Sequence, residues 1–236
     1  MVKKKSAAIK RNTFINSKLS IIVNVLILIL GSTSLVVSAL SKENEGFLLS
    51  FRYMTFNGTV FSTLVSAIVL LLSVKESRTG RAFWQKRMYF FKLSSAVTEI
   101  IIAVVIALSF LPSVPDNPNL LSYDSFNMHL IIPVLSVLSF LLHPTAAGNT
   151  RMLTHLTCAW LITLYSAVII TLIAFDMLPQ KLIPYSFLDI HTMPIWYIAA
   201  FGTFIFSFAY VLSFILTDVQ DRLCFVRQTK KPVSSK

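Results

Sequence analysis

Residues 122–144 read SYDSFNMHLIIPVLSVLSFLLHP, and this stretch decides how the rest of the chain is interpreted. Its apolar part, residues 127–142, is short for a membrane span of about 20 residues, so we expect it to be tilted or embedded near one surface. His129 lies at the start of this run, and Pro133 follows one turn later. Because proline has no N–H, the His129 carbonyl is expected to lose its helical hydrogen bond. A titratable ring and a freed carbonyl are costly in hydrocarbon, so His129 is the first candidate for function.

The composition of the chain is that of an integral membrane protein. Of 236 residues, 55% are hydrophobic and only 13% are charged, about half the charged fraction of a soluble domain. The net charge of +11 lies in short basic patches between apolar runs, which indicates orientation in a membrane and not binding of nucleic acid. Cys158 and Cys224 have no disulfide or metal spacing, and His143 and His155 lack an acidic neighbour. We therefore expect neither a metal nor a cofactor.

Six apolar runs predict an all-α membrane protein, a bundle of six transmembrane helices. The runs cover residues 19–40, 53–74, 89–111, 127–142, 157–175 and 195–216. This divides the chain into a basic N-terminal segment (1–18), a six-helix membrane domain (19–216) and a basic tail (217–236). Eighteen of the 21 Lys and Arg residues fall on the side that holds both termini. The positive-inside rule therefore predicts that both termini are cytoplasmic.

In this topology the start of the second span lies at the same depth as His129, near the non-cytoplasmic surface. Four hydroxyl residues of the second span share one helix face by their spacing: Thr55, Thr59, Ser62 and Ser66. On the fourth span, Ser136 follows His129 by seven residues and shares its face. Two polar stripes of this kind most simply face each other inside the bundle. They are either ordinary hydrogen-bonding contacts between membrane helices or, for Thr55 and His129, a functional pair.

The chemistry open to Thr55 and His129 is nucleophilic attack on an acyl carbon. A threonine hydroxyl is a weak nucleophile until a base takes its proton, and histidine titrates in the right range. Either Asn57 or an unpaired N–H in the first turn of the second span could stabilise the oxyanion. The residue that would orient the imidazole stays open among three on the same side of the membrane: Asp124, Tyr185 and Asp189.

Glu99 is the other unusual residue, because it lies inside the third apolar run. Its position, about 15 Å from the cytoplasmic end, is close to the midplane and level with Ser62, Ser66 and Ser136. Burial favours the neutral carboxyl, which can bond to these hydroxyls. Such a residue is a candidate for proton movement or for binding a lipid headgroup, and the alternative is a structural bond across helices. It lies about 9 Å deeper than His129, so direct contact between the two is not expected.

Three motifs resemble those of a known family. YMTF at 53–56 resembles the threonine motif of the androgen-induced and androgen-dependent TFPI-regulating proteins, which are six-span membrane hydrolases. His129 with Pro133 and Leu135 resembles their histidine motif, and PYSFLD at 184–189 resembles their tyrosine–proline–phenylalanine–leucine segment. The chain is most similar to the bacterial relatives, the Pr-six-Pr membrane proteins, in its histidine-to-proline spacing.

The resemblance implies a hydrolase of fatty-acyl lipid esters in a bacterial inner membrane, with Thr55 as nucleophile and His129 as base. Two features depart from the family pattern: Gly58 or Thr59 replaces the polar residue one turn after the threonine, and the tyrosine–proline order is reversed. The alternative is a non-catalytic six-span protein, a small transporter or a partner subunit, with a polar path past Glu99. Membrane lipids are the expected partners in either case, and no oligomeric state is predicted.

Overall fold

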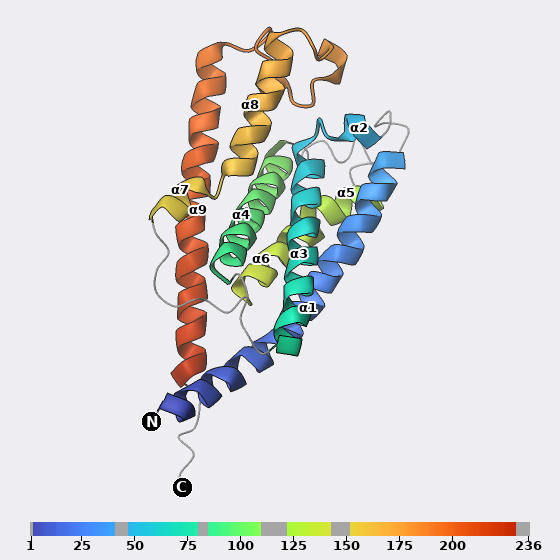
Figure 1. Ribbon diagram of the computed structural model, residues 1–236. Coiled ribbons are helices and arrows are strands. Elements are labelled where there is room, and N and C mark those ends of the chain that lie inside the picture. Colours follow the sequence, from blue (N-terminus) through green and yellow to red (C-terminus); the bar gives the residue numbers. More distant parts are fainter. Residues whose placement is uncertain (1, 41–46, 80–84, 110–121, 143–151, 230–236) are drawn as a thin grey trace.

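The computed structural model describes residues 2–40, 47–79, 85–109, 122–142 and 152–229, and these residues form helices joined by turns (Figure 1). Six segments are long and apolar enough to cross a membrane: Lys18–Leu40, Met54–Thr79, Arg87–Leu108, Tyr123–Leu141, Met152–Ala174 and Ile195–Leu223. This confirms the prediction of an all-α, six-span membrane protein. The start of the first helix and the end of the last lie at the same end of the molecule (Figure 1).

The first half of the membrane domain consists of three long helices and one short one. Their bounds are α1 Val2–Leu40, α2 Phe47–Ser50, α3 Met54–Thr79 and α4 Gln85–Ser109. The second half contains more interruptions. It comprises α5 Tyr123–Phe126, a π-helical turn Asn127–Ile131, α6 Ile132–Leu141, α7 Met152–Thr157, α8 Trp160–Ala174, two 3₁₀ turns Gln180–Leu182 and Ser186–Leu188, and α9 Ile195–Thr229.

Several helices extend beyond the apolar runs that predict them. The fourth span begins at Tyr123 and not at residue 127, the fifth begins at Met152, and the last helix continues to Thr229. The physical reason is that hydropathy reports which residues suit hydrocarbon, whereas backbone hydrogen bonding continues into the polar boundary of the membrane.

The helix that carries His129 is locally widened. In the π-helical turn the Ile132 N–H donates to the Asn127 carbonyl, five residues back. Pro133 follows as the second residue of α6, a position where a missing N–H is tolerated. Single π turns often occur at functional sites, because they redirect side chains relative to the rest of the helix.

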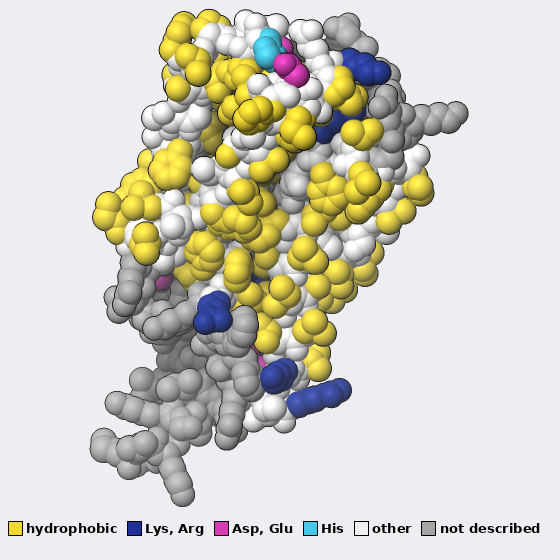
Figure 2. Space-filling view, turned by 45° about the horizontal axis from the view of Figure 1, so that its top comes forward, with side chains coloured by type: hydrophobic (Ala, Val, Ile, Leu, Met, Phe, Trp, Pro, Cys, Tyr) yellow, Lys and Arg dark blue, Asp and Glu magenta, His cyan; other side chains and the backbone are white. Residues whose placement is uncertain are grey.

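The bundle has two parts. α1, α3, α4 and α6 pack closely together, whereas α8 and α9 lie against α4 at the opposite side and have little contact with each other (Figure 1). Leu93, Val97, Phe140 and Ala209 belong to the apolar core that joins α4, α6 and α9. Apolar side chains cover the middle of the face seen in Figure 2, and charged ones gather toward its two ends, as in a membrane-embedded surface.

The segment between α8 and α9 is held by local hydrogen bonds. Asp176 has a left-handed backbone with φ 53°, and the Met177 N–H donates to the Leu172 carbonyl at 2.9 Å, which ends α8 in a Schellman motif. Asp189 organises the turn before α9, where its carboxylate accepts from the His191 N–H at 3.0 Å. This segment carries Tyr185 back over the bundle.

Candidate functional site

Thr55 and His129 meet in the structure, as their equal depth predicts. Thr55 Oγ1 lies 3.3 Å from His129 Nε2. Thr55 is the second residue of α3 and His129 is in the π-helical turn, so two different helices supply the pair. Thr55 is 7% exposed, which shields the contact from bulk solvent. A hydroxyl and an imidazole in this arrangement are the minimum set for base-assisted nucleophilic attack.

The partner of the second ring nitrogen of His129 is Ser125, a residue that the sequence analysis missed. His129 Nδ1 lies 3.0 Å from Ser125 Oγ. Ser125 precedes His129 by four residues in a helical segment, and this spacing was the available signal. In the tautomer with its proton on Nδ1, His129 donates to Ser125 and leaves Nε2 as the acceptor for the Thr55 hydroxyl. Asp124, one of the three expected candidates, instead accepts from Ser122 at 2.7 Å.

Tyr185 is brought to the other side of Thr55. Burial raises the pKa of the Tyr185 phenol, and the nearby polar groups of Thr55 and Met54 lower it in part. Tyr185 lines the same cavity as Met54 and Thr55, so it lies beside the first turn of α3. The neutral phenol is therefore a hydrogen-bond donor beside the Thr55 hydroxyl.

Asn57 supports the entry to α3 and is not directed at the Thr55–His129 pair. Its Nδ2 donates to the Phe51 carbonyl at 2.7 Å and to the Tyr53 carbonyl at 2.8 Å, which uses both amide hydrogens. An oxyanion was expected to be stabilised either by Asn57 or by an unpaired N–H in the first turn of α3. The N–H groups of that turn are better placed than Asn57.

Asp189 is buried but does not contact His129 in the described residues. Besides the His191 N–H, its carboxylate accepts from Thr192 Oγ1 at 2.9 Å. Both bonds lie within the turn that precedes α9. Asp189 therefore positions the segment that carries Tyr185. The residue beside the imidazole is Ser125 and not Asp189.

Glu99 meets Ser62, as its depth predicts, and shares no hydrogen bond with His129 in the described residues. Ser62 Oγ donates to Glu99 Oε1 at 2.6 Å and lies 2.8 Å from Ser95 Oγ. Glu99 is 0% exposed, and its Oε2 has no hydrogen-bond partner among the described residues. The hydroxyls of Thr59 and Ser136 are also buried without a partner in the same part of the chain. The bundle interior thus contains a polar cluster below the Thr55–His129 pair.

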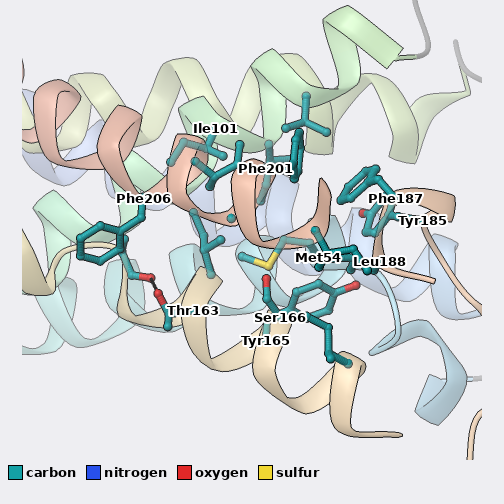
Figure 3. Close-up of a pocket in the computed structure, with 18 of the residues that line it drawn as sticks. Met54, Ile101, Thr163, Tyr165, Ser166, Tyr185, Phe187, Leu188, Phe201 and Phe206 are labelled. Carbon is teal, nitrogen blue, oxygen red and sulfur yellow. Dashed lines mark hydrogen bonds between the residues drawn. The ribbon is translucent and has the colours of Figure 1, made fainter. Parts of the chain in front are cut away.

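Thr55 lines an apolar cavity of about 270 Å³. Figure 3 shows this cavity with its neighbours Met54 and Tyr185 labelled. Its lining comes from α3, α4, α8, α9 and the segment before α9, and is mostly isoleucine, valine, leucine and phenylalanine. The side chains that bring polar atoms to the lining are Thr55, Thr163, Tyr165, Ser166 and Tyr185. Tyr165 is held by a hydrogen bond to the Arg52 carbonyl. His129 does not line the cavity and reaches it only through Thr55.

The remaining histidines have structural contacts or lie outside the described residues. His155 Nδ1 lies 3.0 Å from Ser213 Oγ, and its ring stacks on Phe214. His143 and the side chain of Cys224 are not described by the structure. In the described part of the chain, no group of three or more His, Cys, Asp or Glu could hold a metal ion.

No protein-family model, curated protein sequence or solved structure matches this chain.

Proposed function

We propose that this protein is an intramembrane hydrolase of fatty-acyl lipid esters, with Thr55 as nucleophile and His129 as general base. The observation that carries the proposal is the 3.3 Å contact between Thr55 Oγ1 and His129 Nε2 at the wall of an apolar cavity. Catalytic hydrogen bonds are often slightly long without substrate and shorten when it binds. An apolar cavity beside a nucleophile suits a substrate whose ester is attached to an acyl chain.

The reaction proceeds through an acyl-enzyme. Thr55 Oγ1 bonds to the ester carbon while its proton passes to His129 Nε2, and the carbonyl oxygen becomes an oxyanion. The N–H groups at the start of α3 and the Tyr185 phenol donate to that oxyanion. The tetrahedral intermediate then expels the alcohol, which takes the proton from His129. A water oxygen then bonds to the acyl carbon and gives its proton to His129. The bond to Thr55 Oγ1 breaks, Thr55 takes the proton back from His129, and the carboxylic acid leaves.

Ser125 positions the base in this mechanism. By accepting from Nδ1–H it selects the tautomer whose Nε2 faces Thr55. A serine stabilises the imidazolium less than a carboxylate would, because it carries no charge. We therefore propose a slow hydrolase, in which exclusion of water and orientation of the substrate supply much of the rate.

The proposed location is a bacterial inner membrane, with both termini in the cytoplasm. The distribution of Lys and Arg supports this orientation, which places Thr55 near the non-cytoplasmic surface. The resemblance of the YMTF, histidine and PYSFLD motifs to the androgen-induced hydrolases and their bacterial relatives supports the same assignment of roles.

The direct test is covalent labelling of the purified protein in detergent or vesicles by an alkyl fluorophosphonate. Labelling is expected at Thr55, to be lost in Thr55→Ala and His129→Ala, and to be retained in Thr55→Ser. Thr59→Ala is the matched control, since Thr59 is a buried threonine one turn further along α3. Labelling that persists in both Thr55→Ala and His129→Ala would remove the assignment.

A second candidate function rests on Glu99. A buried carboxyl with one unpaired oxygen, bonded to Ser62 and surrounded by further buried hydroxyls, is the kind of group that carries protons through membrane proteins. This reading makes the protein a small transporter or a partner subunit. In liposomes, Glu99→Gln should then abolish a pH-dependent flux that Thr55→Ala leaves intact. A flux that survives Glu99→Gln would exclude this role.

A further inference from the structure

We infer that the cavity at Thr55 binds one acyl chain of a lipid from the adjoining leaflet, and that the chain enters sideways between α8 and α9 past Gly202. The inference rests on the proposed function for the chemistry at Thr55. Binding of the chain itself does not require Thr55 to react, so the two can be tested separately.

The depth of the cavity matches one leaflet. At one end Thr55 is the second residue of α3, at the boundary of the membrane. Deeper in the membrane, Thr163 and Phe206 each lie eleven residues from the span end on the same side, about 16 Å at 1.5 Å per residue, and Ala159 lies four residues beyond Thr163. The hydrocarbon core of a bilayer is about 30 Å thick, so the cavity runs from the surface to near the midplane.

The course of the cavity, from the membrane surface toward the midplane, agrees with the way a membrane lipid is arranged. Acyl chains point toward the midplane, and the ester groups that hold them lie at the boundary. A lipid that moves sideways into the cavity would keep its chain at the same depth and bring its ester to the level of Thr55. It would not need to turn over or to leave the membrane.

The cavity is open toward the lipid at Gly202. This residue lines the cavity and is exposed, and a Cβ added to it would meet no atom within 4 Å. Thr163 on α8 and Phe206 on α9 also line the cavity and are exposed. α8 and α9 both pack on α4 and both line the cavity, so the opening at Gly202 lies between these two helices. At this depth the molecules outside the opening are lipid chains.

The opposite wall of the cavity is closed. Met54 and Ile102 are buried between α3 and α4, and Ile101 is buried on the α4 side. The cavity of about 270 Å³ is near the lower limit for ligand sites, which favours one chain over two. The substrate class that this predicts is an ester in which a single acyl chain can separate from the rest of the lipid.

The test uses photo-crosslinking in vesicles. The full chain is reconstituted in phosphatidylcholine with a small fraction of an alkyne-tagged fatty acid that carries a diazirine either near its carboxyl group or near its methyl end. After irradiation, the modified residues are mapped by mass spectrometry. The methyl-end probe should modify the region of Thr163 and Phe206, and the carboxyl-end probe the region of Met54 and Tyr185. The reverse order would overturn the proposed direction of the chain.

Two tryptophan variants separate entry from general lipid contact. Gly202→Trp should reduce crosslinking inside the cavity at least fivefold, because the indole fills the mouth. Thr203→Trp is the matched control, since Thr203 is exposed on the same helix and does not line the cavity. Equal crosslinking in both variants would overturn the inference. If Gly202→Trp lowers the thermal stability more than Thr203→Trp does, Gly202→Leu replaces it with the same expected reduction.

The experiments distinguish a failure of acyl-chain binding from a failure of catalysis at Thr55. Crosslinking should be unchanged in Thr55→Ala, because that substitution removes the nucleophile and keeps the cavity. Retained crosslinking with no fluorophosphonate labelling would contradict the hydrolase and support the lipid site. Labelling of Thr55 without crosslinking in the cavity would contradict the lipid site alone.

Discussion

Thr55 and His129 are separated by 74 positions in the chain, yet Thr55 Oγ1 lies 3.3 Å from His129 Nε2. The contact joins the start of α3 to a π-helical turn that precedes Pro133. It lies between Ser125 on one side and the apolar cavity on the other. Ser125, His129 and Thr55 therefore follow one another in a line that ends at the cavity, in the order that the proposed mechanism needs for positioning group, base and nucleophile.

Ser125→Ala should slow fluorophosphonate labelling of Thr55 by about 3- to 10-fold, because one hydrogen bond of roughly 0.5–1.5 kcal/mol no longer holds the imidazole. The rate of labelling measures this directly. Ser122→Ala is the control, since Ser122 is exposed and its hydroxyl bonds only to Asp124 in the described residues. Equal rates for the wild type and Ser125→Ala would mean that Ser125 does not orient His129.

Tyr185 should make the thermal stability depend on pH in the alkaline range. Burial raises the pKa of its phenol above the usual value of about 10, so the folded state holds the proton more tightly than the unfolded state does. The stabilisation is fully present below pH about 10 and is lost as the pH rises from there toward the folded-state pKa. The melting temperature should fall more steeply with rising alkaline pH in the wild type than in Tyr185→Phe. Parallel curves of melting temperature against pH for the wild type and Tyr185→Phe would contradict this prediction. Tyr197→Phe is the control, since Tyr197 is exposed, and its curve should follow that of the wild type.

Two glycines should respond in opposite ways to alanine. A Cβ at Gly31 would overlap Thr63 Oγ1 where α1 packs against α3, whereas a Cβ at Gly202 meets nothing. Gly31→Ala should therefore lower the free energy of unfolding by about 1–3 kcal/mol. Gly202→Ala should leave it unchanged or raise it by up to about 1 kcal/mol, since alanine favours helix. Denaturant unfolding in detergent measures both values. If Gly31→Ala keeps the wild-type free energy of unfolding, the contact between α1 and α3 can adjust without a loss of stability, and the prediction is wrong.

Asp189 should prove to be a positioning residue. Asp189→Ala removes the acceptor of the His191 N–H and of the Thr192 hydroxyl, and we expect a loss of about 1 kcal/mol, as for a lost helix cap. Asp189→Asn keeps one acceptor oxygen and should recover part of the loss. Because Asp189 acts through the segment that carries Tyr185, labelling of Thr55 should fall in parallel with stability across the two variants. Labelling abolished in Asp189→Asn, with its stability retained, would instead place Asp189 in the chemistry.

Some contacts were predictable because helices convert position in the sequence into depth in the membrane. Each helical residue adds 1.5 Å, so Thr55 and His129, each two residues into its apolar run (53–74 and 127–142), were expected at one level. The same argument placed Glu99 level with Ser62, to which it is bonded. It did not identify Ser125, because depth alone could not choose among Asp124, Tyr185 and Asp189, and a neutral hydroxyl one turn before a histidine is common.

The six spans and the depths of Thr55, His129 and Glu99 were determined by the sequence alone, since hydropathy and helical rise are local properties of the chain. The tertiary structure decided which faces of those helices meet. The π-helical turn brings His129 to Thr55, and the packing of α8 and α9 on α4 leaves an apolar cavity of about 270 Å³. No local pattern encodes that cavity, because its wall is assembled from four helices and one connecting segment whose separation depends on how all of their side chains pack together.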